Sequence, residues 1–189
     1  MKRLLFFAVL WMFSLSSFSQ AETADQEENQ VKKETKYEKF FSNYGTFLRF
    51  VEYKLPKFDF QKDWINETCI REFVDINNGE KSYFLRIRSG YPRQTESIAY
   101  EDLIKVIDAI KQLKSQFAKD SQVGNYLEFR FTTEDGMQIG YYYSDNKPTW
   151  FMTVTGDTRF FKKDFDFEKA FVDAKQEIEK LMGNSLEDK

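Results

Sequence analysis

The chain has 189 residues, a formal net charge of −3, no histidine and a single cysteine. Without histidine it cannot form a Ser-His-Asp or Cys-His catalytic set, and one cysteine provides neither an internal disulfide nor a structural zinc site. The mild acidity argues against a nucleic-acid-binding protein, because such proteins usually carry a basic surface, and the length indicates about one domain.

The first 21 residues have the order of a secretory signal peptide. Lys2 and Arg3 precede an apolar run over residues 4–13, and Ser19-Gln20-Ala21 forms a small-x-small cleavage site. The apolar run is shorter than the roughly 20 residues that span a bilayer. We expect cleavage after Ala21, no transmembrane segment in the mature chain, and export to the periplasm or the extracellular medium. A buried N-terminal helix is the alternative. Cleavage would remove two positive charges and change the net charge from −3 to −5.

The mature chain is predicted to form one α+β domain over residues 35–183. Residues 22–34 are acid-rich and contain no aromatic residue, which predicts a disordered leader, and residues 184–189 are predicted to form a disordered tail. The expected domain contains one antiparallel sheet of about six strands and three helices, in the order α-ββ-α-ββββ-α, with the helices packed on one face of the sheet.

The first predicted element is an amphipathic helix from about Thr35 to Tyr53. Apolar and aromatic residues recur there at spacings of three and four, which is the pattern of one helix face. Thr35 is a suitable N-cap and Pro56 would end the helix. Such an aromatic stripe fits a core helix or a helix that fills a groove on a partner. The stripe comprises Tyr37, Phe40, Phe41, Tyr44, Phe47, Leu48 and Val51.

A hairpin and a helix are predicted next, after an extended connector over residues 55–62. Asn77-Asn78-Gly79-Glu80 separates two strand-like segments, Cys69–Ile76 and Lys81–Arg88, and Asn-Gly predicts a type I′ turn. Cys69 has apolar neighbours and is interpreted as a small buried residue, not a reactive thiol. A turn over residues 89–92 leads to a helix from about Tyr100 to Ala118.

Four further strands and a last helix complete the predicted domain. We expect Phe129 and Trp150 to be core residues, because each lies on the apolar face of an alternating segment. Asp166 would cap the last helix at its start and Gly183 at its end. The predicted ranges are Tyr126–Thr133, Met137–Ser144, Thr149–Thr155 and Thr158–Lys162 for the strands, and about Phe167–Met182 for the helix.

The predicted elements repeat in a loose way along the chain. Strands followed by a helix occur at about residues 68–118 and again at about 126–182. The match is one of pattern, not of identity. A tandem duplication and two ordinary α+β units both fit it.

Chemical motifs are sparse. The chain has neither a glycine-rich phosphate loop nor a GxSxG nucleophile elbow, so we expect no catalytic residues and no cofactor. Asp164, Asp166 and Glu168 form a compact acidic cluster that could bind Ca²⁺, but acidic residues before a helix also cap its amide groups. We favour the capping interpretation and expect no metal site.

The outward side of the predicted sheet is the candidate binding surface. Arginine beside aromatic residues is typical of interface anchors, although such pairs also pack across strands without a ligand, and the first helix could cover them. Arg88, Tyr91 and Arg93 near the Gly90 turn are a second, weaker candidate for an anion site. The predicted binding residues are Phe84, Arg86, Arg88, Arg130, Tyr142 and Phe151, with Glu128 beside them.

These patterns favour an exported, non-enzymatic binding protein. Its expected partner is a protein or another macromolecule of the envelope or the extracellular medium, and not a nucleic acid. A small-ligand carrier with an aromatic-lined pocket between helix and sheet is the alternative. A carboxylate-based hydrolase is the third hypothesis and would require two carboxylates facing each other across a cleft.

Overall fold

The computed structural model describes residues 34–42, 45, 47–62, 66–90, 93–120, 126–144 and 147–187. These residues belong to one compact unit, Lys33–Lys189. The predicted signal peptide and, apart from Glu34, the predicted acidic leader lie outside the described residues. No helix in the described ranges is long and apolar enough to cross a membrane.

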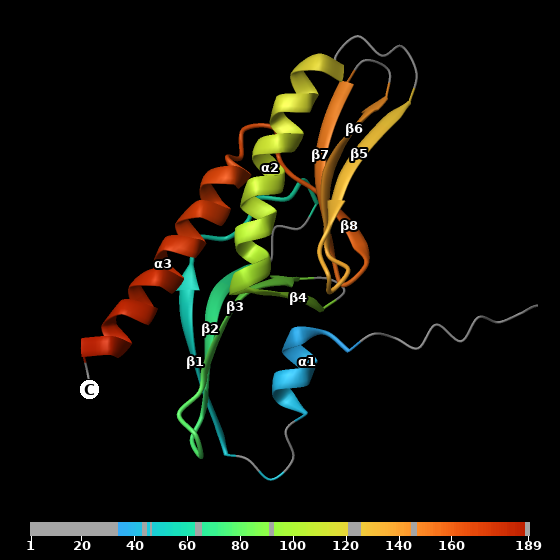
Figure 1. The fold of residues 1–189 in the computed structure, drawn as a ribbon. Helices are drawn as coiled ribbons and strands as arrows, with labels where there is room; N and C mark the ends of the chain where they lie inside the picture. The colour runs from blue at the N-terminus through green and yellow to red at the C-terminus, as the bar shows by residue number, and fades with distance from the viewer. Residues whose placement is uncertain are drawn as a thin grey trace, which may run out of the picture. The chain divides into compact units, whose positions relative to one another are not determined.

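The described elements form two four-stranded antiparallel sheets and three helices. The first sheet has the strand order β1-β2-β3-β4 and the second has the order β5-β6-β7-β8, so each is a meander followed by a helix. The α+β class is therefore confirmed, whereas a single sheet of about six strands in the order α-ββ-α-ββββ-α is wrong. In chain order (Figure 1) the elements are α1 (Lys36–Phe41), β1 (Leu48–Leu55), β2 (Glu67–Asp75), β3 (Lys81–Ser89), β4 (Gln94–Ala99), α2 (Tyr100–Asp120), β5 (Leu127–Thr132), β6 (Gln138–Ser144), β7 (Lys147–Val154), β8 (Asp157–Phe160) and α3 (Phe167–Glu187).

The predicted first helix is divided into a short helix and an edge strand. Helix α1 ends at Phe41, and Gly45 has a φ of 81°, a left-handed conformation that does not continue a right-handed helix. In β1 the partly buried residues Val51, Tyr53 and Leu55 alternate with exposed ones. This two-residue period suits a strand paired with β2, and the three-to-four spacing of the aromatic residues did not reveal it.

Strand β4 is the second element absent from the sequence prediction. Its sequence, Gln94 to Ala99, is largely polar, and only Ile98 and Ala99 are buried. It is a strand because it pairs antiparallel with β3, from Phe84 opposite Ala99 to Ser89 opposite Gln94. Pairing with a neighbouring strand thus overrides a weak local signal.

One hydrophobic core joins the two sheets and the two long helices. Helices α2 and α3 lie side by side (Figure 1). In β3 and β6, for example, alternate side chains enter this core: Leu85 and Ile87 in β3, and Ile139 and Tyr141 in β6. The largest fully buried side chains include Phe58, Ile70, Leu85, Ile87, Leu103, Ile110, Ile139, Tyr141, Met152, Phe171 and Ile178.

Of the two residues predicted to be in the core, only Trp150 packs against it. Trp150 is partly buried and packs against Phe167, with ring centroids 5.0 Å apart. Phe129 is 44% exposed, so the prediction of a core position is wrong. Phe129 belongs to β5, which is an edge strand and therefore has a neighbour on only one side.

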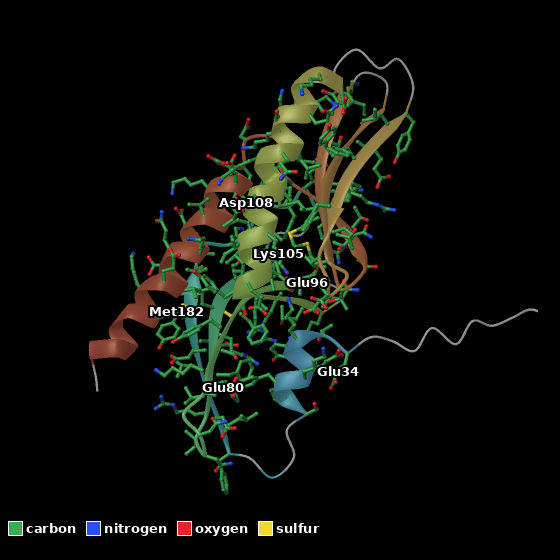
Figure 2. All side chains as sticks on the ribbon, viewed as in Figure 1. Glu34, Glu80, Glu96, Lys105, Asp108 and Met182 are labelled. Carbon is green, nitrogen blue, oxygen red and sulfur yellow. The ribbon has the colours of Figure 1, made fainter. Side chains whose placement is uncertain are left out.

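Two contacts outside the core join the first and second halves of the domain. The connector over residues 56–62 forms neither a helix nor a continuous strand, and Phe60 forms an antiparallel bridge with Phe161 after β8. Elsewhere Glu96 of β4 lies beside the β7–β8 turn of the second sheet (Figure 2), where its Oε2 accepts a hydrogen bond from the Thr155 amide at 2.7 Å. The first and second sheets are thus joined by polar contacts as well as by the core.

Turn and cap geometries refine several local predictions. The hairpin at residues 77–80 forms, but only Gly79 has a positive φ there, so the turn is not type I′. Thr155 and Gly156, with φ of 50° and 84°, form the two-residue β7–β8 turn. The Asp166 carboxylate accepts a hydrogen bond from the Lys169 amide at 3.1 Å, which confirms it as a helix cap, and α3 continues past Gly183 to Glu187.

Candidate functional site

The outward side of the first sheet carries the most concentrated group of charged and aromatic side chains. Because successive residues of a strand point to opposite faces, Glu52, Arg71 and Phe84 share this side as direct cross-strand neighbours. Arg86 and Arg88 follow along β3 at two-residue steps. We call this surface the first-sheet outer face.

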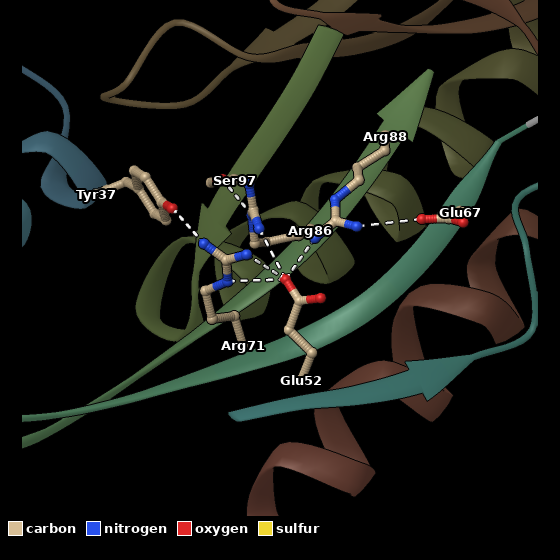
Figure 3. A network of polar contacts seen from close by, with 7 residues as sticks. All are labelled: Tyr37, Glu52, Glu67, Arg71, Arg86, Arg88 and Ser97. Carbon is tan, nitrogen blue, oxygen red and sulfur yellow. Dashed lines mark hydrogen bonds and ion pairs between the residues drawn. The ribbon is translucent and has the colours of Figure 1, made fainter. Parts of the chain in front are cut away.

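Three arginines converge on one carboxylate oxygen in this face (Figure 3). Glu52 Oε1 accepts hydrogen bonds from Arg71 Nε and from Arg86 Nη1, both at 2.9 Å, and from Arg88 Nη2. Arg88 also donates through Nη1 to Glu67 Oε2 at 3.1 Å. We call Arg71, Arg86, Arg88 and Glu52 the arginine cluster.

The cluster is partly withdrawn from water. The Arg71 and Arg86 side chains are 13% and 10% exposed, whereas Glu52 and Arg88 are 30% and 32% exposed. Burial alone would raise the pKa of Glu52, but the hydrogen bonds from Arg71 and Arg88 outweigh it and lower that pKa. Burial lowers the pKa of the Arg86 guanidinium. Glu52 is therefore held as an anion among the arginines.

Helix α1 covers one end of the first-sheet outer face. The Tyr37 ring packs edge-on against Phe84 and Phe73, with centroid distances of 5.3 and 5.5 Å, and its hydroxyl accepts a hydrogen bond from Arg71 Nη1 at 2.8 Å. The Arg86 guanidinium lies 5.4 Å from the centre of the same ring. Tyr37 thus links the small aromatic cluster under α1 to the arginine cluster.

Two carboxylates fix helix α1 in place: Asp102 of α2, and Asp135 in the β5–β6 turn. The Lys36 amide donates to Asp135 Oδ2 at 3.0 Å, and Lys36 Nζ donates to Asp102 Oδ2 at 2.5 Å. Asp102 is 1% exposed, so its charge requires this pairing, which a second lysine, Lys105, completes. The position of α1 on the sheet is therefore specified by buried polar contacts as well as by ring packing.

Aromatic rings remain exposed beside the cluster. Phe41, Phe47 and Phe50 are 53%, 76% and 53% exposed. The Arg71 guanidinium lies 4.8 Å from the centre of the Phe50 ring, which is a cation–π distance. An arginine and an exposed ring are therefore presented together on this face.

The predicted binding residues do not share one surface, because they are divided between two sheets. Phe84, Arg86 and Arg88 lie on the first sheet, and Phe84 is only 3% exposed beneath α1. The other three predicted residues, Arg130, Tyr142 and Phe151, lie on the second sheet.

The second-sheet residues form a looser group. Arg130 is 53% exposed and pairs with Glu128 at 3.3 Å. Tyr142 stacks on Tyr126 with centroids 6.0 Å apart, and Phe151 is only 5% exposed. No group of arginines comparable to the one around Glu52 occurs on this sheet within the described residues.

Three residues of the site were not singled out in the sequence. Glu52 was placed in a helix, where its pairing with Arg71 could not be foreseen. The sequence pattern predicts a strand at Arg71. It places Tyr37 in an aromatic stripe that fits either a core helix or a helix that binds a partner. The alternation of Glu52 and Lys54 with Val51, Tyr53 and Leu55 was the signal that could have revealed a strand with an outward carboxylate.

Two other sequence candidates have structural roles, whereas of the weaker anion-site candidate Arg88 and Arg93 are described and Tyr91 lies outside the described residues. Cys69 is 5% exposed, and burial raises the pKa of its thiol, which fits a small buried residue. Asp166 caps α3 and Glu168 pairs with Lys114 at 2.5 Å. In the part of the chain that the structure describes, no group of three or more potential ligands could hold a metal ion.

Compared with protein-family models, with curated proteins and with solved structures, the chain matches none.

Proposed function

We propose that this chain is an exported, non-enzymatic protein that binds an acidic macromolecule of the envelope or the extracellular medium through the first-sheet outer face. The observation that carries the proposal is the convergence of three guanidinium groups on Glu52 in a face that is still partly open to solvent. The proposed partner supplies acidic groups to the arginines and apolar surface to the exposed rings beside them.

The charge of the face supports an acidic partner. Three arginines share two carboxylates, Glu52 and Glu67, which leaves one positive charge unbalanced on a chain whose net charge is −3. Guanidinium groups bind carboxylates and phosphates through paired hydrogen bonds, and they keep their charge at physiological pH. A local positive surface on an acidic protein also favours productive orientation of an acidic partner.

The exposed rings support a macromolecular partner. Phe41, Phe47 and Phe50 present aromatic surface beside the cluster, and Arg and aromatic residues dominate the binding energy of many protein interfaces. Phe50 lies on β1, Phe41 ends α1 and Phe47 directly precedes β1, and none of the three lines one of the described hollows. This geometry suits a broad partner surface better than an enclosed small molecule.

Matched alanine variants on the two sheets test the proposal. The mature chain would be used to capture its partner from the native envelope fraction, and the affinity of each variant for that partner would be measured. Phe50→Ala and Arg88→Ala should each weaken binding about tenfold or more, since interface anchors contribute at least ~1–2 kcal/mol. Phe129→Ala and Arg130→Ala carry the same changes on the second sheet and should bind like the unchanged protein. The opposite pattern would refute the first-sheet outer face as the binding surface.

Arg86 differs from the exposed anchors because its side chain is 10% exposed and paired with Glu52. Arg86→Ala should lower the free energy of unfolding by about 1.5–2 kcal/mol, because it removes a hydrogen bond to a charged group, although Glu52 keeps Arg71 and Arg88 as partners. Arg130→Ala should cost less than about 1 kcal/mol, as expected for an exposed pair. Urea unfolding of both variants measures the difference. Equal stability of the two variants would contradict the structural role of Arg86.

Export is a separate part of the proposal and rests on the N-terminal residue order. Sequencing of the protein recovered outside the cytoplasm should give Glu22 as its first residue. Recovery of a chain that still begins with Met1 would refute cleavage after Ala21.

A small-ligand carrier is the second candidate function, because a partly apolar groove lies between α3 and the end of β1. One hollow of about 240 Å³ is lined by Leu55, Phe58, Phe165 and Ala170, among others. A neighbouring hollow of about 380 Å³ shares Leu55 with it. Saturable binding of a fluorescent fatty acid that Ala170→Trp abolishes, without change in macromolecular binding, would favour this candidate.

A further inference from the structure

A polar hollow lies at the end of the first-sheet outer face, next to the arginine cluster. Its volume is about 350 Å³, and it opens between the start of β2 and the β3–β4 turn. The arginine cluster and the hollow share Arg88. The residues that line the hollow include Glu67, Arg88, Ser89, Arg93, Gln94 and Thr95.

The hollow contains two guanidinium groups and one carboxylate. Arg88 already pairs with Glu67 at 3.1 Å, but Arg93 is exposed and forms no ion pair with any described residue. Glu67 is 73% exposed, so its hold on Arg88 is that of a surface pair and is weak. Arg93 is therefore available to an incoming anion, and Arg88, which Glu52 Oε1 also holds through Nη2, offers its Nη1 side once an anion displaces Glu67.

A third arginine supports the wall of the hollow from the second sheet. Arg159 Nη2 donates to Ser89 Oγ at 3.2 Å and to Gln94 Oε1 at 3.0 Å. Ser89 is only 4% exposed and follows Arg88 directly in β3, so its side chain points to the opposite side of the strand and supports the wall. Gln94 Nε2 in turn donates to Asp157 Oδ2 at 2.8 Å, which fixes the Gln94 side chain.

Arg159 also adds positive charge behind the wall. Its Nε atom is buried and has no hydrogen-bond acceptor among the described residues. Its side chain is 18% exposed, and its nearest carboxylate, that of Asp157, lies 3.7 Å away. The hollow is thus formed by a positively charged wall whose polar groups are held in place.

We propose that this hollow is a binding site for a tetrahedral oxyanion, a phosphate or sulfate group, held by Arg88 and Arg93. Two guanidinium groups that each donate paired hydrogen bonds suit an anion with at least three oxygen atoms better than a carboxylate, which has two. In the free protein Glu67 occupies Arg88 and competes with the anion. The site adjoins the surface of the proposed function but does not depend on a macromolecular partner.

Inorganic phosphate is the probe for the test, which uses the mature chain alone. Amide chemical shifts would be followed by NMR during a phosphate titration at low, constant ionic strength, with acetate in a parallel titration. The changes in amide chemical shift should be largest at residues 88–90 and 93–95 and should saturate as phosphate is added. Acetate should bind at least several-fold more weakly. Glycerol phosphate as a third ligand distinguishes a site for free phosphate, which excludes the ester, from a site for a phosphate group on a larger molecule.

Two variants with opposite expected effects make the test specific. Arg93→Ala should weaken phosphate binding about tenfold, because it removes a charged donor that forms no ion pair with the described residues. Glu67→Gln should strengthen binding several-fold, because it releases Arg88 Nη1 and removes a negative charge from the hollow, while Arg88 Nη2 stays bonded to Glu52. Arg130→Ala removes an exposed arginine from the other sheet and is the matched control.

The proposal is overturned if Arg93→Ala binds phosphate as well as the unchanged protein, or if Arg130→Ala weakens binding equally. It is also overturned if Glu67→Gln fails to strengthen binding. Thermal melting of each variant, measured without phosphate, confirms that the compared proteins are folded. Because no macromolecular partner is present, a negative result leaves the proposed function of the first-sheet outer face intact.

Discussion

At the scale of single residues, Glu52 explains how three arginines can lie so close together. Like charges at this distance repel, and the repulsion is stronger where water is partly excluded. A carboxylate at the centre offsets it, since Glu52 Oε1 accepts hydrogen bonds from all three. The arginine cluster therefore depends on a single side chain, Glu52, which the edge strand β1 contributes. Glu52 keeps the guanidinium groups oriented in the free protein, which lowers the conformational entropy that would be lost on binding the proposed partner.

Glu96 is the residue whose charge should make stability depend on pH. Burial, helped by the nearby charge of Asp135 and opposed by the hydrogen bond from the Thr155 amide, raises the pKa of Glu96 to about 7. The folded protein therefore binds this proton more tightly than the unfolded chain, in which glutamate has its ordinary pKa of about 4.3. By linkage, the free energy of unfolding should fall as the pH rises from about 4.5 to about 7, and this contribution should be constant above that range.

Glu96→Gln tests this pH dependence because it keeps the shape and removes the charge. The variant should be more stable than the unchanged protein at pH 8, by about 1–3 kcal/mol, and its stability should decrease less between pH 4.5 and 7. Urea unfolding at several pH values measures both effects. Glu80→Gln, in the exposed β2–β3 turn, is the control and should leave the pH profile unchanged. A parallel decrease in Glu96→Gln and the unchanged protein would show that another group causes it.

At the scale of elements, local sequence pattern and strand pairing disagree at β1 and β4. Lys36–Phe41 form a helix with Thr35 as its N-cap, as the sequence predicted, and a capping box with Glu38 completes that cap. Beyond this helix the chain pairs with β2 over the whole length of β1. Pairing satisfies the backbone groups of both strands and directs Tyr53 and Leu55 to the core. The stabilisation from pairing requires a second strand that is distant in the sequence, so a local sequence pattern does not predict it.

Two glycines within elements should respond in opposite ways to the same substitution. A Cβ added to Gly140 in β6 would lie 2.9 Å from the Cα of Arg130 in β5, and still closer to the Phe129 carbonyl oxygen. Gly140→Ala should therefore destabilise the protein by more than about 1 kcal/mol through displacement of β5. A Cβ at Gly183 in α3 would meet nothing within 4 Å, so Gly183→Ala should stabilise it by up to about 1 kcal/mol. Urea unfolding should give these two signs, and a stable Gly140→Ala would contradict the close approach of β5 and β6.

At the scale of the whole molecule, the two halves depend on one core. Each half is a four-stranded meander followed by a helix of 21 residues, a closer likeness than the sequence pattern indicated. A tandem duplication fits this order, and it remains a hypothesis. The halves nevertheless do not enclose separate cores, because buried side chains from both sheets and both long helices form one cluster.

The shared core predicts that both halves unfold together. Phe171 of α3 is fully buried, and its ring centroid lies 4.9 Å from that of Phe58. Phe171→Ala should lower the free energy of unfolding by about 3–5 kcal/mol, the usual cost of truncating a buried Phe. Hydrogen exchange should show that β3 and β6 lose protection by the same amount. Phe129→Ala, at a ring 44% exposed, is the control and should cost much less. Loss of protection confined to one sheet would show that the halves unfold independently.

The sequence by itself determined the α+β class, the two long helices, the N-terminal capping of α1 and α3, and the buried state of Cys69, whereas the predicted end of α3 at Gly183 is wrong. These features depend on local periodicity, on turn residues and on side chains that bond to their own helix ends. Only the tertiary structure decided the number of sheets, the strands β1 and β4, and which arginines lie together. The physical reason is that strand pairing joins residues distant in the chain, such as Glu52 and Arg71, and that an edge strand leaves Phe129 exposed although its pattern is that of a buried face.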